Sequence, residues 1–198
     1  MFSIVGENVI NTLTYLKHTM IAVIENFINL SALIALITSL MFIFLFLGYK
    51  FLPQEQSRKI NLFFKNISPY SLWGAFIVSL FATLSSLFYS EIMGFNPCPL
   101  CWYQRIFMYV LPIITFVAII RKDKNVFYYI APLSVIGMFI AAYHYGVQIR
   151  DSLICSGALD CSFIYNLSYG FMTIPVMAFS GFLLTFILVF LHKRFFKR

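Results

Sequence analysis

Residues 96–120 read NPCPLCWYQRIFMYVLPIITFVAII, and this stretch decides the class of the fold. A helix needs about 20 predominantly apolar residues to cross the hydrocarbon core of a bilayer. The part from Cys101 to Ile120 supplies such a run, with Arg105 as its one charged residue. The sequence therefore predicts a membrane-spanning helix that begins at a pair of cysteines, Cys98 and Cys101.

Four further stretches are apolar and long enough to cross a membrane, so the predicted spans are 28–49, 70–89, 101–120, 126–145 and 172–191. Before the first span, apolar residues recur at helical spacing from Ile10 to Phe27, which is typical of an amphipathic helix lying along the membrane interface. We expect an all-α membrane protein: a four-transmembrane-helix bundle core (66–198) with one additional N-terminal transmembrane helix. Residues 1–65 would hold the interfacial helix, the extra span and a basic cytoplasmic linker.

The composition agrees with a membrane protein. Of the 198 residues, 61% are hydrophobic and 11% are charged, whereas a soluble domain has roughly 45–50% and about 25%. These values exclude a soluble globular, disordered or collagen-like chain. The net charge of +7 would also suit a nucleic-acid-binding protein. Basic residues of membrane proteins, however, gather in cytoplasmic loops, and we expect no nucleic acid among the partners.

The basic residues predict the orientation of the chain. Most of them fall between the first two spans, between the third and fourth spans, and in the C-terminal tail: Lys50, Arg58, Lys59, Lys65, Arg121, Lys122, Lys124, Lys193, Arg194, Lys197 and Arg198. These segments lie on one side of the membrane, which the positive-inside rule makes cytoplasmic. We therefore expect a multi-pass protein with its N-terminus outside and its C-terminus in the cytoplasm.

The cysteines form two pairs, Cys98 and Cys101 in CPLC and Cys155 and Cys161 in CSGALDC. In the predicted topology both pairs face the non-cytoplasmic compartment, where disulfides form and persist. A zinc site is one alternative, but CSGALDC is wider than the usual spacing of about two to four residues between ligands. Structural disulfides are another, although closing so short a loop stabilises by only about 2 kcal/mol. Close spacing suits reversible thiol–disulfide exchange, and a redox-active function is our prediction.

The start of the third span favours reactive sulfur. Asn96 and Pro97 are residue types preferred at the N-cap and first position of a helix, which would place Cys98 and Cys101 in the first turns. There the positive end of the helix dipole favours a thiolate over a thiol. Arg105 would share their helical face and stabilise a thiolate, or an anion on a bound acceptor. The alternative for Arg105 is an arginine that reaches the lipid headgroups.

The order of these features resembles the DsbB family. NPCPLCWYQR opens a membrane helix, a basic turn and a further span follow, and an outer CSGALDC precedes a span that begins FMTIPVMAF. The resemblance covers residues 70–197, and the short spacing in the second pair is similar to the BdbC-type branch. It implies a thiol oxidase of a bacterial cell (inner) membrane that acts on a thioredoxin-fold, DsbA-like thiol oxidase outside the cytoplasm. The electrons would pass to a membrane quinone, ubiquinone or menaquinone.

The resemblance also implies roles for the predicted site residues. Cys155 and Cys161 would form the pair that exchanges with the partner. Cys98 and Cys101 would re-oxidise that pair. Cys101 would face the quinone, with Arg105 beside the quinone oxygen.

His144 lies between Tyr143 and Tyr145 at the outer end of the fourth span. We expect it to approach the quinone ring, which needs protons on reduction. The alternative is a histidine of the aromatic belt at the membrane surface.

Two other functions fit parts of the sequence. A non-enzymatic membrane scaffold or transporter would keep its cysteines as structural disulfides. A transmembrane electron conduit that delivers reductant outward would need cysteines near the cytoplasmic side, and no predicted inner loop contains one.

Overall fold

The computed structural model describes residues 2–48, 53–123, 125–150 and 161–196, with side chains from Thr14 onward except that of Arg150. The predicted site residue Cys155 lies outside the described residues. The helices are α1 (Phe2–Gly48), α2 (Gln54–Leu87), η1 (Phe88–Ile92), α3 (Pro99–Arg121), α4 (Val126–Arg150) and α5 (Ile174–Phe195). The short η1 continues α2 as a π-helix. In the described residues the only bridge between extended segments is the isolated one between Ser168 and Met172.

Five of the helices are long and apolar enough to cross a membrane, judged by length and composition. The predicted all-α membrane fold, with a four-helix core and one extra N-terminal helix, is therefore confirmed. The helices run past the predicted spans because an α-helix satisfies its own backbone hydrogen bonds on both sides of the hydrocarbon region. The largest difference is in the predicted linker, where residues 54–65 form the first turns of α2 instead.

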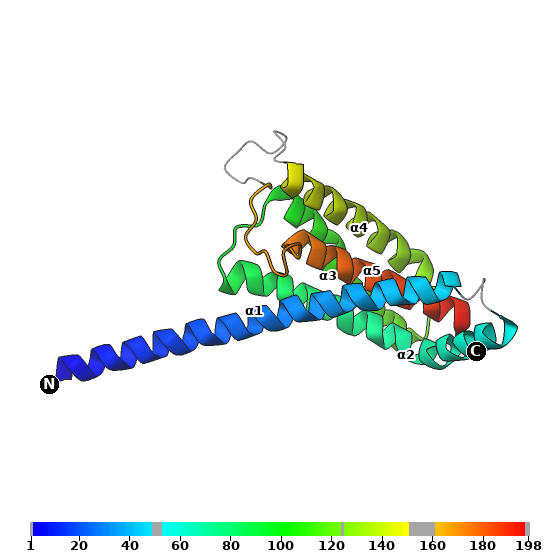
Figure 1. Ribbon diagram of the computed structural model, residues 1–198, viewed down its shortest axis with the longest axis horizontal. Coiled ribbons are helices and arrows are strands. Elements are labelled where there is room, and N and C mark those ends of the chain that lie inside the picture. The colour runs from blue at the N-terminus through cyan, green and yellow to red at the C-terminus, as the bar shows by residue number, and fades with distance from the viewer. Residues whose placement is uncertain (1, 49–52, 124, 151–160, 197–198) are drawn as a thin grey trace.

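The helix α5 lies at the centre of the bundle and packs against α1, α2 and α4 (Figure 1). Its sequence is apolar on all sides, as expected of a helix surrounded by protein. Phe182 and Val189 of α5 are fully buried, and so are Leu111 of α3 and Ile130 of α4. This core fixes the four C-terminal helices relative to one another and so sets the positions of their outer ends.

The helix α1 joins the predicted interfacial segment and the predicted first span into one continuous helix. Figure 1 shows that its N-terminal part projects beyond the other helices, while its C-terminal part lies along the bundle. Ring contacts attach it there, with Phe27 edge-on to Phe81 of α2 and Phe46 edge-on to Phe190 of α5. The placement of residues 10–27 along a lipid surface stays a prediction.

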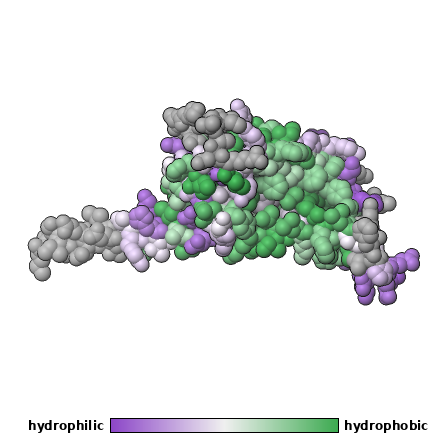
Figure 2. All heavy atoms as spheres, turned by 45° about the horizontal axis from the view of Figure 1, so that its top comes forward, coloured by the Kyte–Doolittle hydropathy of each residue, from purple (hydrophilic) through white to green (hydrophobic). Residues whose placement is uncertain are grey.

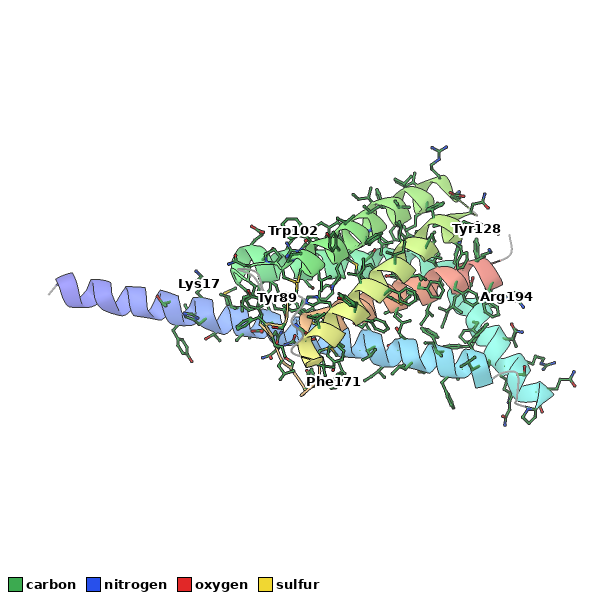
Figure 3. All side chains as sticks on the ribbon, turned by 90° about the horizontal axis from the view of Figure 1, so that it is seen from above. Lys17, Tyr89, Trp102, Tyr128, Phe171 and Arg194 are labelled. Carbon is green, nitrogen blue, oxygen red and sulfur yellow. The ribbon has the colours of Figure 1, made fainter. Side chains whose placement is uncertain are left out.

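The outer surface of the bundle is suited to lipid. Figure 2 shows hydrophobic residues over the middle of the visible face and hydrophilic residues toward the two ends. Figure 3 shows Arg194 and Tyr128 at one end of the bundle and Trp102 toward the other. At the Arg194 end, the Lys193 ammonium lies 3.8 Å from the centre of the Tyr128 ring. A cation over an aromatic ring at a helix end is typical of the membrane–water interface.

Candidate active site

The helix α3 begins two residues later than predicted. Its N-cap is Cys98, in an extended conformation (φ −70°, ψ 167°), and Pro99 is its first residue. The prediction of Asn96 as the N-cap is therefore wrong. The reason is Pro99, whose ring excludes the preceding residue from the helical region and so keeps Cys98 outside the helix. Cys101 then lies in the first turn, where backbone N–H groups are unpaired.

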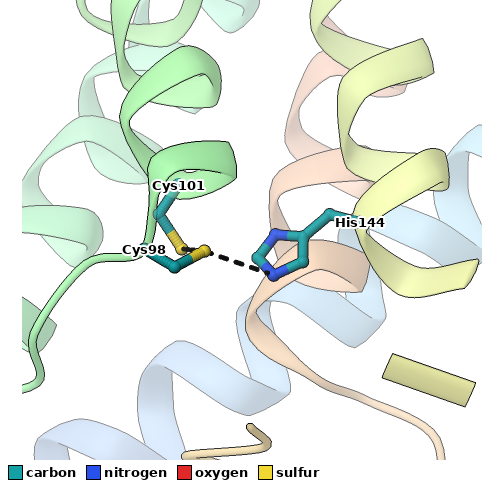
Figure 4. Close-up of side chains that lie close together, drawn as sticks. All are labelled: Cys98, Cys101 and His144. Atoms are coloured by element: carbon teal, nitrogen blue, oxygen red, sulfur yellow. Dashed lines mark hydrogen bonds between the residues drawn. The ribbon is translucent and has the colours of Figure 1, made fainter. Parts of the chain in front are cut away.

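The sulfur atoms of Cys98 and Cys101 lie 3.5 Å apart, with the Cys98 thiol donating a hydrogen bond to Cys101 Sγ (Figure 4). This hydrogen bond and burial raise the pKa of Cys98 to about 11, while the hydrogen bonds from His144 and Cys161 act in the opposite direction. The expectation of a thiolate at both cysteines is therefore wrong for Cys98. In the reduced pair Cys98 therefore keeps its proton near neutral pH.

His144 of α4 lies against the cysteine pair, with its Nε2 atom 3.7 Å from Cys98 Sγ (Figure 4). The same nitrogen is 3.2 Å from the backbone oxygen of Cys161, and Gln104 Nε2 is 2.9 Å from Nδ1 on the other side of the ring. His144 is only 3% exposed, so the interpretation as an aromatic-belt residue is wrong. Its approach to a quinone ring stays a prediction.

These contacts assign the proton on the imidazole. Gln104 donates its side-chain amide to Nδ1, which therefore carries no hydrogen. The proton of the neutral ring is then on Nε2, directed at Cys98 Sγ and at the Cys161 carbonyl oxygen. Gln104 is 5% exposed, and it was not among the predicted site residues. The signal for it was a neutral polar residue inside an apolar span, one turn beyond Cys101.

Cys161 joins this site from the segment that precedes α5. It is 1% exposed and packs with Cys98 and Val147 in a small buried cluster, which Cys101 also contacts. Its side chain also hydrogen-bonds Cys98. One member of each predicted cysteine pair is thus brought into contact, although about 60 residues of chain separate them.

Arg105 is held by the end of α2. Its Nε donates to Ser86 Oγ at 3.1 Å and its terminal nitrogen donates to the Ser86 carbonyl oxygen at 3.3 Å. The guanidinium also lies 5.3 Å from the centre of the Trp102 ring. These contacts, rather than a path to the headgroups, fix the position of the charge one turn below Cys101.

A cavity of about 350 Å³ opens beside Cys101 and Arg105. Most of its lining is apolar, from α1, α2, α3 and α5, and Gln104 is among its polar lining residues. Ser85 of α2 also lines it, and the buried Ser85 hydroxyl has no hydrogen-bond partner within the described parts of the chain. Neither Cys98 nor His144 belongs to the lining. The two sulfurs of the CPLC pair therefore face different surroundings.

The reduced site could also hold a metal ion. Ligand atoms of Cys98, Cys101 and His144 all lie within 4.8 Å of one another, and thiolate with imidazole is a donor set that suits zinc. Formation of a Cys98–Cys101 disulfide would remove two of these three ligands. Metal binding and disulfide chemistry are therefore alternatives at this site.

The chain is similar to known disulfide bond formation proteins. Residues 69–191 match the family model "Disulfide bond formation protein DsbB". The SPbeta prophage-derived disulfide bond formation protein B of Bacillus subtilis is 47% identical over 114 residues, which cover 56% of this chain and 77% of that protein. Disulfide bond formation protein C of the same organism is 40% identical over 126 residues, covering 62% and 91%.

A probable disulfide formation protein C of Halalkalibacterium halodurans is 42% identical over 118 residues, covering 58% of this chain and 86% of that protein. No solved structure matches the chain. The family model covers more than half of the chain and includes the CPLC pair, Arg105, His144 and Cys161. The chain therefore belongs to the DsbB family of disulfide bond formation proteins.

Proposed function

We propose that this protein is a thiol:quinone oxidoreductase that generates disulfides at the outer face of a cell membrane. It re-oxidises a thioredoxin-fold, DsbA-like dithiol outside the cytoplasm and passes the electrons to a membrane quinone. One observation carries the proposal: Cys98 hydrogen-bonds both Cys161 and Cys101, and Cys101 lines an apolar cavity together with Arg105. This chain of contacts connects one member of the outer cysteine pair to the apolar cavity.

The first step takes place at the outer cysteine pair. A thiolate of the reduced partner attacks the Cys155–Cys161 disulfide and forms a mixed disulfide with one of its sulfurs. The second thiolate of the partner then attacks the partner's own sulfur in that mixed disulfide. This forms the partner's disulfide and releases the sulfur of this protein as a thiolate. The partner has lost two electrons, and Cys155 and Cys161 hold them as two thiols.

The second step moves the electrons to the CPLC pair. The Cys161 thiolate attacks Cys98 of the Cys98–Cys101 disulfide, which forms a Cys161–Cys98 bond and releases Cys101 as a thiolate. Cys155 then attacks Cys161 and releases Cys98. The contact between Cys98 and Cys161 supports this order. The position of Cys101 in the first turn of α3, with Arg105 one turn below, supports Cys101 as the first sulfur released.

His144 assists the release of Cys98. Its Nε2–H faces Cys98 Sγ and donates a hydrogen bond to the sulfur as negative charge develops there. Gln104 acts as a positioning residue, because its amide keeps the proton on Nε2. Burial of both side chains excludes water, which would compete for these hydrogen bonds.

The cavity fits a quinone. Its apolar walls suit an aromatic ring and an isoprenoid chain, and its size falls within the range of small-molecule sites, about 300–1,000 Å³. Arg105 and the Ser85 hydroxyl, which has no partner among the described residues, are hydrogen-bond donors for carbonyl oxygens. A bound quinone supplies a two-electron acceptor that also takes up two protons. Cys101 is the sulfur that this cavity exposes to it.

The test uses the full-length protein in detergent with a short-chain quinone and a reduced thioredoxin-fold dithiol. We expect quinone-dependent oxidation of the dithiol. Cys101→Ala and Cys161→Ala should each lower turnover by at least about 10³-fold, as expected for loss of a covalent catalyst. Tyr103→Ala, at an exposed position of α3, is the matched control and should keep full turnover.

Acid trapping and alkylation of the thiols separate this proposal from the two other functions. During turnover the cysteines should cycle between thiol and disulfide, and removal of quinone should trap them as thiols. A scaffold or transporter with structural disulfides predicts cysteines that stay oxidised with or without quinone. A conduit for reductant predicts that the cysteines are reduced from the cytoplasmic side, independently of the outer dithiol.

A further inference from the structure

The helix α1 forms a wall of the cavity that Cys101 and Arg105 line. The family model begins at residue 69, so the whole of α1 lies outside the part of the chain that the family explains. Six residues of α1 nevertheless line this cavity: Ile28, Ser31, Ala32, Ile34, Ala35 and Thr38. They alternate with residues on the opposite side of α1, such as Ile37, which is 57% exposed on the outer surface.

The rotation of α1 about its axis is fixed by a buried asparagine. Asn29 is 3% exposed, and its side chain donates to Ser168 Oγ at 2.7 Å. Its oxygen accepts hydrogen bonds from Tyr89 at 3.2 Å and from Asn166 at 3.1 Å. A buried amide is costly unless its hydrogen bonds are made, so one orientation of α1 is strongly favoured. That orientation turns Ala32 toward the cavity.

The same asparagine connects α1 to the segment that carries Cys161. Asn166 and Ser168 lie between Cys161 and α5, and Tyr89 lies in η1. Asn166 also donates to the Tyr89 hydroxyl at 3.0 Å. Tyr165 of this segment lines the cavity as well. The extra helix therefore meets both the wall of the acceptor cavity and the outer segment beside the cysteines.

We infer that α1 is part of the electron-acceptor site and sets which quinones fit there. This inference rests on the proposed function, because it assumes that the acceptor occupies this cavity. Small side chains, Ser31, Ala32 and Ala35, face the space. They leave room for a flat ring between α1 and α3. A larger side chain at Ala32 would therefore occupy part of that room.

The test is Ala32→Phe in the full-length protein, with Ile37→Phe as a matched control on the outer face of α1. The first readout is the quinone that stays bound through purification, extracted and quantified by its absorbance. We expect Ala32→Phe to retain at least tenfold less quinone than the unaltered protein, and Ile37→Phe to retain the same amount. The second readout is steady-state kinetics, in which Ala32→Phe should raise KM for a short-chain quinone about tenfold and leave KM for the dithiol unchanged.

Equal quinone binding by folded Ala32→Phe and by the unaltered protein would overturn the role of α1. If Ala32→Phe does not fold, Ala32→Leu replaces it, with at least a threefold loss of bound quinone expected and unchanged binding again contradicting the inference. Failure of the proposed function looks different. In that case the unaltered protein itself binds no quinone and oxidises no dithiol with it.

Discussion

The two cysteines of the CPLC pair are not equivalent, and their pH dependence should show it. The thiolate is the species that reacts with an alkylating reagent, so alkylation of Cys98 should rise with pH until about 11, its raised pKa. The hydrogen bond to Cys101 is the largest cause of this rise. Cys101→Ala should therefore move the pH profile of Cys98 alkylation to lower pH. Each unit by which the pKa of Cys98 falls gives about tenfold more thiolate at pH 8.

A control with the opposite sign is available at Cys161. Its hydrogen bond lowers the pKa of Cys98, so Cys161→Ala should move the alkylation profile to higher pH. Peptide mass spectrometry of the reduced protein, quenched at intervals over pH 7–12, measures both shifts. The same direction of shift in the two variants would contradict the hydrogen-bond arrangement of the three sulfurs.

The role of His144 makes a separate prediction. His144→Ala removes the hydrogen-bond donor at Cys98 Sγ and should slow electron transfer from the outer pair to the CPLC pair by about 10²-fold. His144→Gln retains an N–H donor and should recover part of this loss. Quenched alkylation after a pulse of reduced dithiol measures the rate. Quinone retention by His144→Ala tests the predicted approach of His144 to the quinone ring, which requires a loss of bound quinone and which unchanged retention would contradict.

The chemistry of single residues could be predicted from the sequence only in part. Spacing and the predicted membrane side marked the four cysteines as candidates, because sulfur pairs and charged loops leave clear local patterns. The contact between Cys98 and Cys161 depends on how α3 and the segment before α5 meet, and no local pattern encodes that meeting. Gln104 and Asn29 could not be predicted for the same reason, since each acts through partners far away in the sequence.

At the scale of the helices, the packing of α4 against α5 depends on one glycine. A Cβ atom at Gly137 would overlap the ring of Phe182, which is fully buried. Gly137→Ala should therefore destabilise the fold by about 1–3 kcal/mol, the usual cost of overpacking. Gly146→Ala on the same helix is the control, because its Cβ would meet nothing within 4 Å among the described residues. That control should be neutral or stabilising by up to about 1 kcal/mol.

Unfolding in mixed detergent, followed by circular dichroism, measures both variants against the unaltered protein. Equal stability of Gly137→Ala and Gly146→Ala would show that α4 can move away from Phe182 at no cost. The close contact would then not be a condition of the fold.

The number and order of the helices could be predicted from the length of each apolar stretch, because that length is a property of the stretch alone and does not depend on its partners. Helix ends were harder to predict, because they depend on stereochemistry at single residues. Both Pro97 and Pro99 are suited to the first turn of a helix. The steric effect of Pro99 on Cys98 makes α3 begin at Pro99 and not at Pro97. The position of α1 was the least predictable feature, since its largely apolar membrane span does not mark the face that meets the bundle.

For the whole molecule, the proposed function requires basic charge and sulfur to lie at opposite ends of the bundle. Arg121 and Lys122 end α3, and Lys193 and Arg194 lie in the last turn of α5. The described cysteines lie at the opposite ends of these helices, at the start of α3 and before α5. Because a thiol oxidase must meet its partner in an oxidising compartment, the basic end should be cytoplasmic.

This orientation can be tested in intact cells with a membrane-impermeant maleimide. In a background without the four native cysteines, Glu91→Cys places one exposed thiol near the start of α3, and Gln56→Cys places one near the start of α2. We expect labelling of Glu91→Cys in intact cells, and labelling of Gln56→Cys only after the membrane is permeabilised. The two positions lie at opposite ends of the segment formed by α2 and η1, so they must report opposite sides if it spans the bilayer. Labelling of Gln56→Cys from outside would show that the topology is the reverse of the predicted one. The sulfurs would then lie in a reducing compartment, and an outward-facing oxidase would have no physical basis.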